Sequence, residues 1–199
     1  MNEYLKNVDS LNKLFGKLNG KYFGGTLEPL TITIQSDVKN YGHFTPAKVW
    51  TDTLKNSTHE INISPNFQRD KYAVVATLLH EMVHAYAHAN GIKDTSRQGR
   101  YHNKIFKKLA EERGLIIEYA DCIGWSVTRP SESLCAFVDE TRIKLCDCFR
   151  DGERKEPKDS KPRPKKYKYK CPLCELTIET INDNARIMCI TCNHELQRE

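Results

Sequence analysis

The segment from residue 70 to residue 90 constrains the fold of this chain more than any other part of its sequence. Its apolar residues recur at helical spacing around much of the helix, and Gly91 follows in the position after a C-terminal cap. We therefore expect a long and largely buried helix. Its middle nevertheless reads His80-Glu81-Met82-Val83-His84. Burying two imidazoles and a carboxylate is costly unless a metal ion or polar partners satisfy them.

The spacing of these polar residues suits a zinc centre. Residues four apart share a helix face, with β-carbons about 5 to 6 Å apart, so His80 and His84 can bind one Zn²⁺. Glu81 points about 100° around the helix, where it can take a proton from water instead of binding the metal. The pattern predicts a catalytic zinc ion held by both histidines, with Glu81 as the catalytic base of a peptidase. The alternative is that the histidines lie on a solvated helix edge or form hydrogen bonds in the core.

A catalytic zinc ion has three protein ligands and one open position for water. The candidates for the third ligand are His59, His88, His102, Glu111 and Glu112. His88 lies two helical turns beyond His80, about 12 Å along the axis, so the two cannot share an ion. The glutamates lie off the apolar stripe of a second helix expected over residues 102 to 113, and no positional argument supports His59. His102 lies on the buried face of that helix, and we choose it as the third ligand.

The other periodicities predict an α+β fold. An amphipathic helix is expected over residues 4 to 19, with Asn19-Gly20 as its stop. Three short strands of an antiparallel or mixed sheet are expected over residues 30–34, 42–50 and 60–64. Residues 115 to 150 contain apolar patches without an assignable period. We place one main domain over residues 1 to 150, in which helices pack on a small three-stranded sheet.

Two Cys-x-x-Cys pairs dominate the C-terminal segment: Cys171 with Cys174, and Cys189 with Cys192. Two such pairs joined by a hairpin give a tetrahedral site for a structural zinc ion, and we expect a zinc ribbon over residues 171 to 199. A redox dithiol or an iron site is the alternative. A unit of this size has almost no core, so the metal is expected to fold it. Four cysteines without matching spacing are expected to be buried or free thiols: Cys122, Cys135, Cys146 and Cys148.

Residues 151 to 170 contain three prolines among many charges and predict an extended basic linker. Their excess of cations accounts for the net charge of +5 and indicates a polyanion partner. The linker ends in alternating cations and aromatics that suit phosphate contacts and base stacking on DNA: Lys165, Lys166, Tyr167, Lys168, Tyr169 and Lys170. The alternatives are a solvated linker or a nuclear-import-like stretch over residues 161 to 166.

No apolar run reaches the length of a signal peptide or a membrane span, so we expect a cytoplasmic monomer with no membrane partner. In a reducing compartment, cysteines favour metal binding over disulfides. In a prokaryote the protein is expected to associate with the nucleoid.

Together, these residues resemble the SprT-like family, which includes bacterial SprT proteins and the eukaryotic protease Spartan. The resemblance covers roughly residues 5 to 117, and the C-terminal cysteine unit looks like the bacterial arrangement. It is carried by Leu11-Asn-Lys-Leu-Phe15, Asn19-Gly-Lys-Tyr-Phe-Gly-Gly-Thr-Leu27, Ile61-Asn-Ile-Ser-Pro65, Leu78-Leu-His-Glu-Met-Val-His-Ala85, Gly99-Arg-Tyr-His-Asn103 and Arg113-Gly-Leu115.

The resemblance implies a zincin fold and a DNA-associated zinc metalloprotease that cleaves proteins bound or crosslinked to DNA. It implies His80, His84 and His102 as zinc ligands and Glu81 as the catalytic residue, with one catalytic and one structural zinc ion in all. Around the third ligand, Spartan-like members have a Gly-His-Gly type signature, whereas His102 lies between a tyrosine and an asparagine. The alternative function is a nucleic-acid or transcription-complex binding zinc protein with an inactive His-Glu-x-x-His site.

Overall fold

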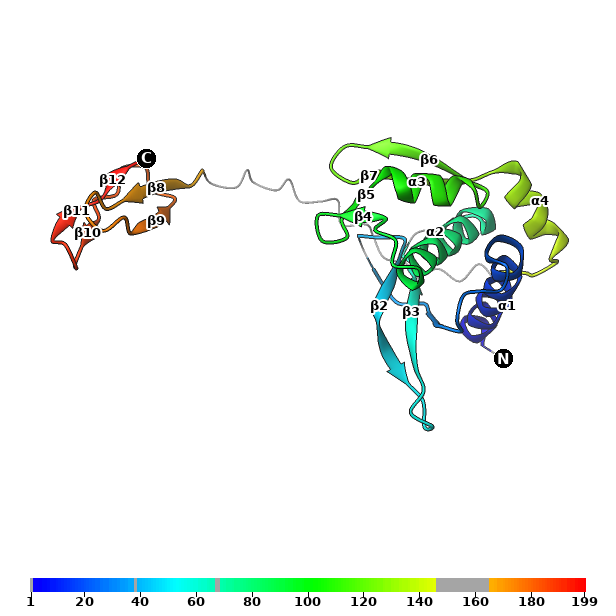
Figure 1. Cartoon of the computed structure of the whole chain (residues 1–199). Helices are drawn as coiled ribbons and strands as arrows, with labels where there is room; N and C mark the ends of the chain where they lie inside the picture. Colours follow the sequence, from blue (N-terminus) through cyan, green and yellow to red (C-terminus); the bar gives the residue numbers. More distant parts are fainter. Residues whose placement is uncertain (1, 38, 67–68, 146–164) are drawn as a thin grey trace. The chain divides into compact units, whose positions relative to one another are not determined.

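The structure is a computed structural model that describes residues 2–37, 39–66, 69–145 and 165–199. The chain divides into two compact units, Met1–Arg154 and Lys155–Glu199 (Figure 1). Residues 151–164 of the predicted linker lie outside the described ranges, as do Cys146 and Cys148. In the described ranges, no helix has the length and apolar character needed to cross a membrane.

Helix α1 spans Glu3–Phe23 and ends four residues later than predicted. The side chain of Asn2 caps its N-terminus by accepting a backbone N–H of the first turn at 3.0 Å. The helix ends at Gly24, whose left-handed conformation, with φ of 60°, suits glycine. The predicted stop at Asn19 was wrong, because the helix continues for four more residues. The side-chain amide of Asn19 instead binds the backbone N–H and C=O of Leu27 in the following loop.

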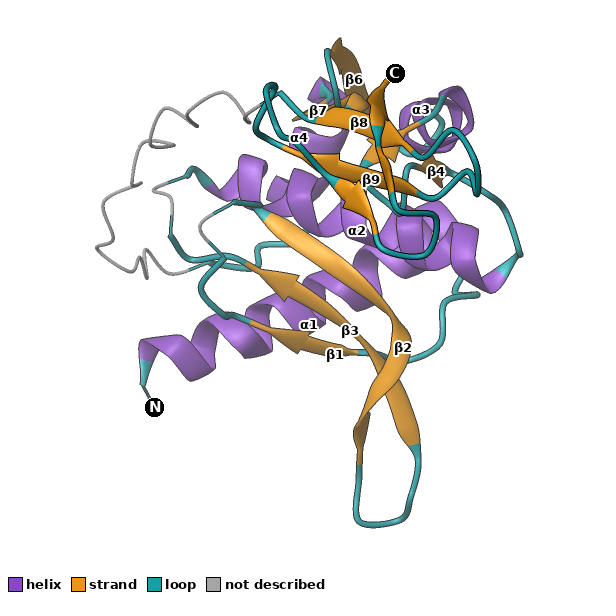
Figure 2. Cartoon of the chain, turned by 90° about the vertical axis from the view of Figure 1, so that its left-hand side faces the viewer, coloured by secondary structure: helices purple, strands orange, loops and turns teal. Residues whose placement is uncertain are grey.

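The first sheet is three-stranded and mixed, as predicted. It consists of β1 (Thr31–Thr33), β2 (Gly42–Thr51) and β3 (Ser57–Ile63). The order is β1-β3-β2, in which β1 runs parallel and β2 antiparallel to β3, so β2 is an edge strand. β2 and β3 continue as a hairpin that extends away from the helices (Figure 2).

The second sheet was not predicted. Its order is β4-β5-β7-β6, and its strands are β4 (Thr95–Ser96), β5 (Tyr101–His102), β6 (Leu115–Ala120) and β7 (Gly124–Pro130). Two of these strands, β6 and β7, lie in the region over residues 115 to 150 that the sequence periodicity left unassigned. Two short helices accompany it, α3 (Lys104–Glu111) and α4 (Glu132–Glu140). The helix predicted over residues 102 to 113 is therefore shorter, and His102 precedes it in a strand.

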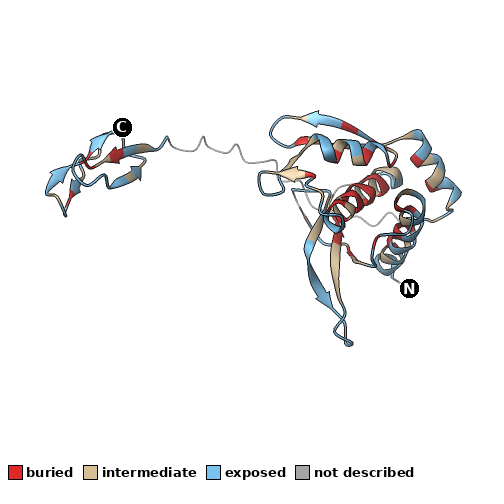
Figure 3. Ribbon diagram, in the orientation of Figure 1, coloured by how far each residue is buried: buried red, intermediate tan, exposed pale blue. Residues whose placement is uncertain are grey.

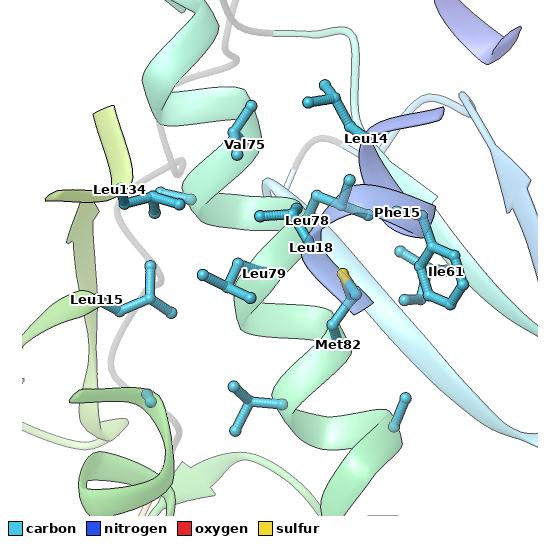
Figure 4. Packing of buried hydrophobic residues seen from close by; sticks show 14 of the residues in the cluster. Leu14, Phe15, Leu18, Ile61, Val75, Leu78, Leu79, Met82, Leu115 and Leu134 are labelled. Carbon is cyan, nitrogen blue, oxygen red and sulfur yellow. The ribbon is translucent and has the colours of Figure 1, made fainter. Parts of the chain in front are cut away.

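Helix α2 spans Lys71–Ala89 and confirms the buried helix predicted over residues 70 to 90. Asp70 caps it by accepting the backbone N–H of Ala73 at 2.8 Å. Its central turns are buried along the whole girth (Figure 3). Leu78 and Met82 pack with side chains of α1 and β3, while Leu79 lies toward β6 and α4 (Figure 4). Because α2 lies between both sheets, any side chain in its middle is held rigidly.

The C-terminal unit contains five short strands: β8 (Tyr167–Lys170), β9 (Thr177–Thr180), β10 (Met188–Cys189), β11 (His194–Glu195) and β12 (Gln197–Arg198). They form one sheet of order β12-β8-β9 and a two-stranded ladder of β10 and β11. The buried core consists of Tyr169, Cys171, Cys189 and Leu196. β8 thus begins four residues before the module predicted from residue 171, within the segment predicted as linker.

Candidate metal centre

Three imidazole rings from two parts of the chain converge beside α2. The Nε2 atom of His84 lies 3.2 Å from that of His80 and 3.0 Å from that of His102, and the last two are 3.2 Å apart. A tetrahedral Zn²⁺ with Zn–N bonds of about 2.0 to 2.1 Å holds its nitrogens about 3.3 Å apart. The triangle therefore has the size that one zinc ion requires.

In two of these imidazoles, the hydrogen bond made by Nδ1 shows which ring nitrogen carries the proton. Nδ1 of His84 lies 2.6 Å from a carboxylate oxygen of Asp94. Nδ1 of His102 lies 3.4 Å from the carbonyl oxygen of Ile123. Because ionised carboxylates and carbonyls only accept hydrogen bonds, each Nδ1 is the protonated nitrogen and each Nε2 keeps a lone pair.

The third imidazole follows the same rule through a hydroxyl group. Nδ1 of His80 lies 2.7 Å from Oγ1 of Thr128, and that hydroxyl donates its hydrogen to the carbonyl of Ser126 at 3.1 Å. Thr128 must therefore accept from His80. All three Nε2 lone pairs then point into one small space, an arrangement that suits a bound cation.

Burial keeps these imidazoles in the form that binds metal. Desolvation, together with the charges of the neighbouring rings, holds the pKa of His80 well below its usual value. The same two causes lower the pKa of His102 to about 4. Neutral imidazole is the form that binds metal, so His80 and His102 have no proton to lose at neutral pH.

Glu81 lies on a different face of α2, directed at the edge strand β2. A methyl group added at Gly42 would lie 3.4 Å from Cγ of Glu81, which shows how closely the strand approaches. The residue is only 6% exposed, and desolvation raises its pKa to about 7, against an opposing hydrogen bond from the backbone of Phe44. A bound cation would lower this pKa again. Glu81 is thus a buried carboxyl with a raised pKa that does not join the imidazole triangle.

His102 reaches the centre from a strand and not from the second helix, so the positional reasoning behind its choice was wrong. Its backbone N–H donates to the carbonyl of Ile123 at 2.9 Å, and β5 pairs in parallel with β7 at Gly124. The next residue, Asn103, caps α3 by accepting two backbone N–H groups of its first turn. Phe106 of α3 packs against all three imidazoles, with ring centroids 4.6 to 4.7 Å apart.

Gly124→Ala is expected to displace His102 and to weaken zinc binding by about tenfold or more. The backbone at Gly124 has φ of 74°, and an added Cβ would lie 2.2 Å from the carbonyl oxygen of His102, so β5 and β7 must separate. Gly99→Ala is the matched control, because its φ is 83° but nothing lies within 4 Å of its Cβ. Competition with a chromophoric chelator measures both zinc Kd values. Equal values for the two variants would contradict the assigned role of Gly124.

Asp94→Asn is expected to lower zinc affinity by about 10- to 100-fold, the usual effect of removing an outer-shell partner of a histidine ligand. Asp94 is buried, and its carboxylate accepts from Nδ1 of His84, which fixes the ring and leaves the lone pair of Nε2 free for a metal ion. Asp121→Asn, at an exposed residue, is the control. Zinc titration measures the Kd of both variants, and urea unfolding compares their stability. An unchanged zinc Kd in Asp94→Asn would show that the carboxylate of Asp94 does not support metal binding.

The other candidates for the third ligand lie elsewhere. His59 and His88 form their own pair, with ring centroids 5.3 Å apart, outside the metal-binding groups found in the described residues. Glu111 and Glu112 face lysines of α3 at 3.7 and 4.0 Å on the surface of that helix. Of the five residues considered, the structure brings only His102 to the pair on α2.

The model of the SprT-like family matches residues 11–119, which is more than half of the 199 residues. The chain belongs to the SprT-like family. Domains of this family are metallopeptidase-like, and the matched range contains the three converging histidines together with Glu81. No curated protein and no solved structure matches the chain. Family membership and geometry therefore point to the same chemistry at this centre.

Outside the range matched to the SprT-like family lies a second candidate metal centre. The Sγ atoms of Cys171, Cys174, Cys189 and Cys192 all lie within 4.8 Å of one another. Sγ of Cys174 is 3.5 Å from that of Cys189, far beyond the about 2.05 Å of a disulfide and close to the about 3.8 Å across a tetrahedral zinc–thiolate site. The backbone N–H groups of Cys174 and Leu173 lower the pKa of Cys171 to about 7, whereas hydrogen bonding to Cys174 raises that of Cys192 to about 12. A bound cation favours the thiolate at all four.

One residue predicted to contact DNA in this SprT-like protein is not available for stacking. Tyr169 is 5% exposed, and its hydroxyl donates to the carbonyl of Asp183 at 2.6 Å. The prediction for Tyr169 was wrong because its ring belongs to the small core of the C-terminal unit.

The four lysines of the same segment differ in their surroundings. Lys166 lies 3.0 Å from Glu179 and Lys170 lies 3.1 Å from Glu175, so both are ion-paired within the unit. Lys165 and Lys168 are exposed. Lys165 lies 5.6 Å from the ring centre of Tyr167, and Lys168 lies opposite Glu179 in the pairing of β8 with β9, where its charge adds to the larger effect of Lys166 in lowering the pKa of that carboxyl. Tyr167 is half-buried, with the guanidinium of Arg198 4.3 Å from its ring centre. Lys165, Lys168 and the part of the Tyr167 ring that the core leaves exposed are what the predicted DNA-binding segment presents to a partner.

Proposed function

We propose that this protein is a zinc-dependent peptidase with a zincin-like centre, in which His80, His84 and His102 bind the metal and Glu81 is the catalytic base. One observation carries the proposal: the Nε2 atoms of the three histidines lie 3.0 to 3.2 Å apart, and the buried carboxyl of Glu81 lies on the helix that carries two of them. Membership of the SprT-like family supports it.

The chemistry divides between the metal and the chain. Bound zinc would supply Lewis acidity, polarising a peptide carbonyl and lowering the pKa of water to about 7. Glu81 accepts the proton of the attacking water and then delivers it to the leaving amine. Asp94, Thr128 and the carbonyl of Ile123 hold the three imidazoles in the required tautomer. The ring of Phe106 packs against all three imidazoles and fixes their orientation.

The edge strand β2 gives a substrate chain a place to bind. An extended peptide can add to the free edge of a sheet through backbone hydrogen bonds. Because β2 passes Glu81 at Gly42, a peptide paired with this strand would run alongside the catalytic carboxylate. The backbone recognition implied here suits protein substrates of many sequences.

In the C-terminal unit we propose a zinc ribbon whose structural zinc ion is held by Cys171, Cys174, Cys189 and Cys192. We further propose that this unit brings the peptidase to DNA, so that its substrates are proteins bound or crosslinked to DNA. Lys165, Tyr167 and Lys168 support contact with a nucleic acid. The ion pairs of Lys166 and Lys170 are exposed to solvent and weak, so DNA phosphates could replace their carboxylate partners.

The test is zinc-dependent cleavage by the full chain. Metal-free protein is titrated with Zn²⁺, and cleavage of casein and of histones is followed with and without single-stranded DNA. Cleavage that appears with zinc and increases with DNA supports the proposal. Cleavage that DNA leaves unchanged would remove the DNA association, and DNA binding without any cleavage would favour a nucleic-acid-binding zinc protein with an inactive centre.

A further inference from the structure

Three aromatic side chains from three strands lie together on the second sheet. Gly124 of β7 pairs with β5 on one side and with β6 on the other. The aromatic residues are Tyr101 of β5, Tyr119 of β6 and Trp125 of β7, and each lies one residue from the position that forms this pairing. The strand order therefore gathers rings that are far apart in the sequence.

The ring of Tyr119 is exposed, yet its neighbours hold it in place. The residue is 49% exposed, whereas Tyr101 and Trp125 are half-buried. The ring centre of Trp125 lies 5.3 Å from that of Tyr119, with the two planes at 67°. A hydrogen bond to the side chain of Tyr101 raises the pKa of Tyr119, and the Tyr101 ring packs over Gly124, where an added Cβ would lie 3.0 Å from it. An exposed ring with a fixed orientation loses little conformational entropy when it binds a flat partner.

Two cations lie over the half-buried rings. The guanidinium of Arg97 lies 4.9 Å from the ring centre of Tyr101, and Nζ of Lys107 in α3 lies 4.0 Å from that of Trp125. Such contacts hold long cationic side chains against aromatic rings. We call these five residues the aromatic surface: Arg97, Tyr101, Lys107, Tyr119 and Trp125.

The aromatic surface lies in a strongly basic part of the chain. Residues 93–108 contain six lysines and arginines against one acid, Asp94, which belongs to the metal centre. Neighbouring elements add three acids: Asp121, whose charge reaches the exposed ring, and Glu111 and Glu112, which face lysines of α3 at 3.7 and 4.0 Å. The cations remain in excess, so this surface suits a polyanion. The six cations are Lys93, Arg97, Arg100, Lys104, Lys107 and Lys108.

A partner that uses both features of this surface must supply negative charges and flat apolar groups. A nucleic acid has both, because its phosphates pair with cations and its bases stack on aromatic rings. In a duplex the base faces are already stacked on one another, so only a single strand leaves them free for Tyr119. An acidic polypeptide has the charges without a row of flat groups. The aromatic surface therefore favours a single-stranded nucleic acid.

We propose that the N-terminal unit binds single-stranded nucleic acid at the aromatic surface. A base stacks on Tyr119 while the phosphates beside it contact Arg97 and Lys107, one of them replacing Glu111 as the partner of that lysine. The inference goes beyond the proposed function, in which the C-terminal unit contacts DNA, and it needs neither that contact nor peptidase activity. Because Tyr101 directly precedes His102 in β5, the bound nucleic acid would lie beside the strand that supplies a metal ligand.

The test follows the fluorescence of Trp125 in the zinc-loaded full chain. The chain has two tryptophans, so Trp50→Phe leaves Trp125 as the single emitter. Titration with an oligothymidylate of about 12 nucleotides should quench this emission and reach saturation. Polyglutamate should not quench it, and a DNA duplex of the same length should bind about tenfold more weakly or worse, because its base faces are covered. Tighter binding of oligothymidylate than of oligouridylate would identify DNA as the source of the strand, and the reverse order RNA.

Matched variants decide whether a base stacks on Tyr119. Tyr119→Ala should raise the oligothymidylate Kd about tenfold or more. Tyr4→Ala removes a 44% exposed tyrosine from α1 and should leave the Kd unchanged. In Trp125→Phe the remaining emitter is Trp50 on the hairpin of β2 and β3, and its emission should not respond to the oligonucleotide.

Four results would each overturn the proposal: quenching without saturation, equal quenching by polyglutamate, equal affinity for the duplex, or a response of Trp50 as large as that of Trp125. A Tyr119→Ala chain that unfolds at lower urea concentration but keeps the parental Kd would also overturn it, because the rings would then only pack the sheet.

Discussion

Glu81→Gln is expected to reduce the rate of protein cleavage by about 10²- to 10⁴-fold while the chain still binds about two zinc ions. Glutamine has the same shape as glutamate, so the buried site between α2 and β2 keeps its packing. It cannot accept a proton from water, and the attacking nucleophile is then not generated at neutral pH. Initial rates on casein, together with elemental analysis of zinc, make the measurement.

The matched control for this variant is Glu111→Gln on the surface of α3, a residue that the sequence offered as a possible ligand. It should cleave at the parental rate and keep the same zinc content, since Glu111 lies against a lysine of its own helix. If the Glu81→Gln and parent chains show the same activity, the measured cleavage does not come from this centre. Loss of zinc in Glu81→Gln would instead mean that Glu81 is a ligand.

The local part of the centre could be predicted from sequence because its geometry is set within one helix. His80 and His84 are four residues apart on α2, and any α-helix brings such a pair to one face. His102 was chosen correctly as the neighbour of this pair, but from a helix that begins two residues too late to contain it. The signal that could have corrected the boundary is Asn103, a favoured N-cap residue, which predicts a helix start at the next residue.

Two partners of the imidazoles, Thr128 and the carbonyl of Ile123, could not be predicted because they depend on strand pairing between distant segments. Thr128 lies on β7, and Ile123 immediately precedes that strand, whose hairpin with β6 the sequence analysis did not find. In β6, Leu115 and Ile117 are buried while Ile116 is 48% exposed, so the apolar run Leu115–Ile117 hides the alternation that marks a strand. An apolar residue on the solvent face was enough to mask the pattern.

The segment before the cysteines carried a strand signal that was interpreted as a stacking surface. Its lysines and tyrosines alternate with a period of two, which is also the pattern of a half-buried strand. In β8, the rings of Tyr167 and Tyr169 both pack toward the core of the C-terminal unit, and Lys168 lies exposed between them. The lysines and tyrosines of this segment suggested a nucleic-acid partner. Their alternation along the strand determines which of these side chains are exposed enough to contact it.

Cys189→Ser is expected to unfold the C-terminal unit and to lower the zinc content of the chain from about two ions to about one. Two of the four buried core residues of the unit are cysteines of the cluster, and its other fully buried residues are Tyr169 and Leu196, against which partly buried side chains pack. Zinc binding to such small units is worth about 10 to 16 kcal/mol and is coupled to their folding. Loss of a ligand that is 1% exposed removes most of that free energy.

Backbone amide NMR signals of residues 165 to 199 should collapse to the narrow dispersion of an unfolded chain in Cys189→Ser, while those of residues 3 to 140 keep their positions. Cys122→Ser is the control, because Cys122 is an exposed free thiol of the N-terminal unit and should change neither zinc content nor spectrum. A C-terminal unit that stays folded with one zinc ion fewer would show that the sheet of β8, β9 and β12 is stable without metal. The four cysteines would then be a reactive or accessory site, because a fold that depends on a structural metal ion is lost when that ion is removed.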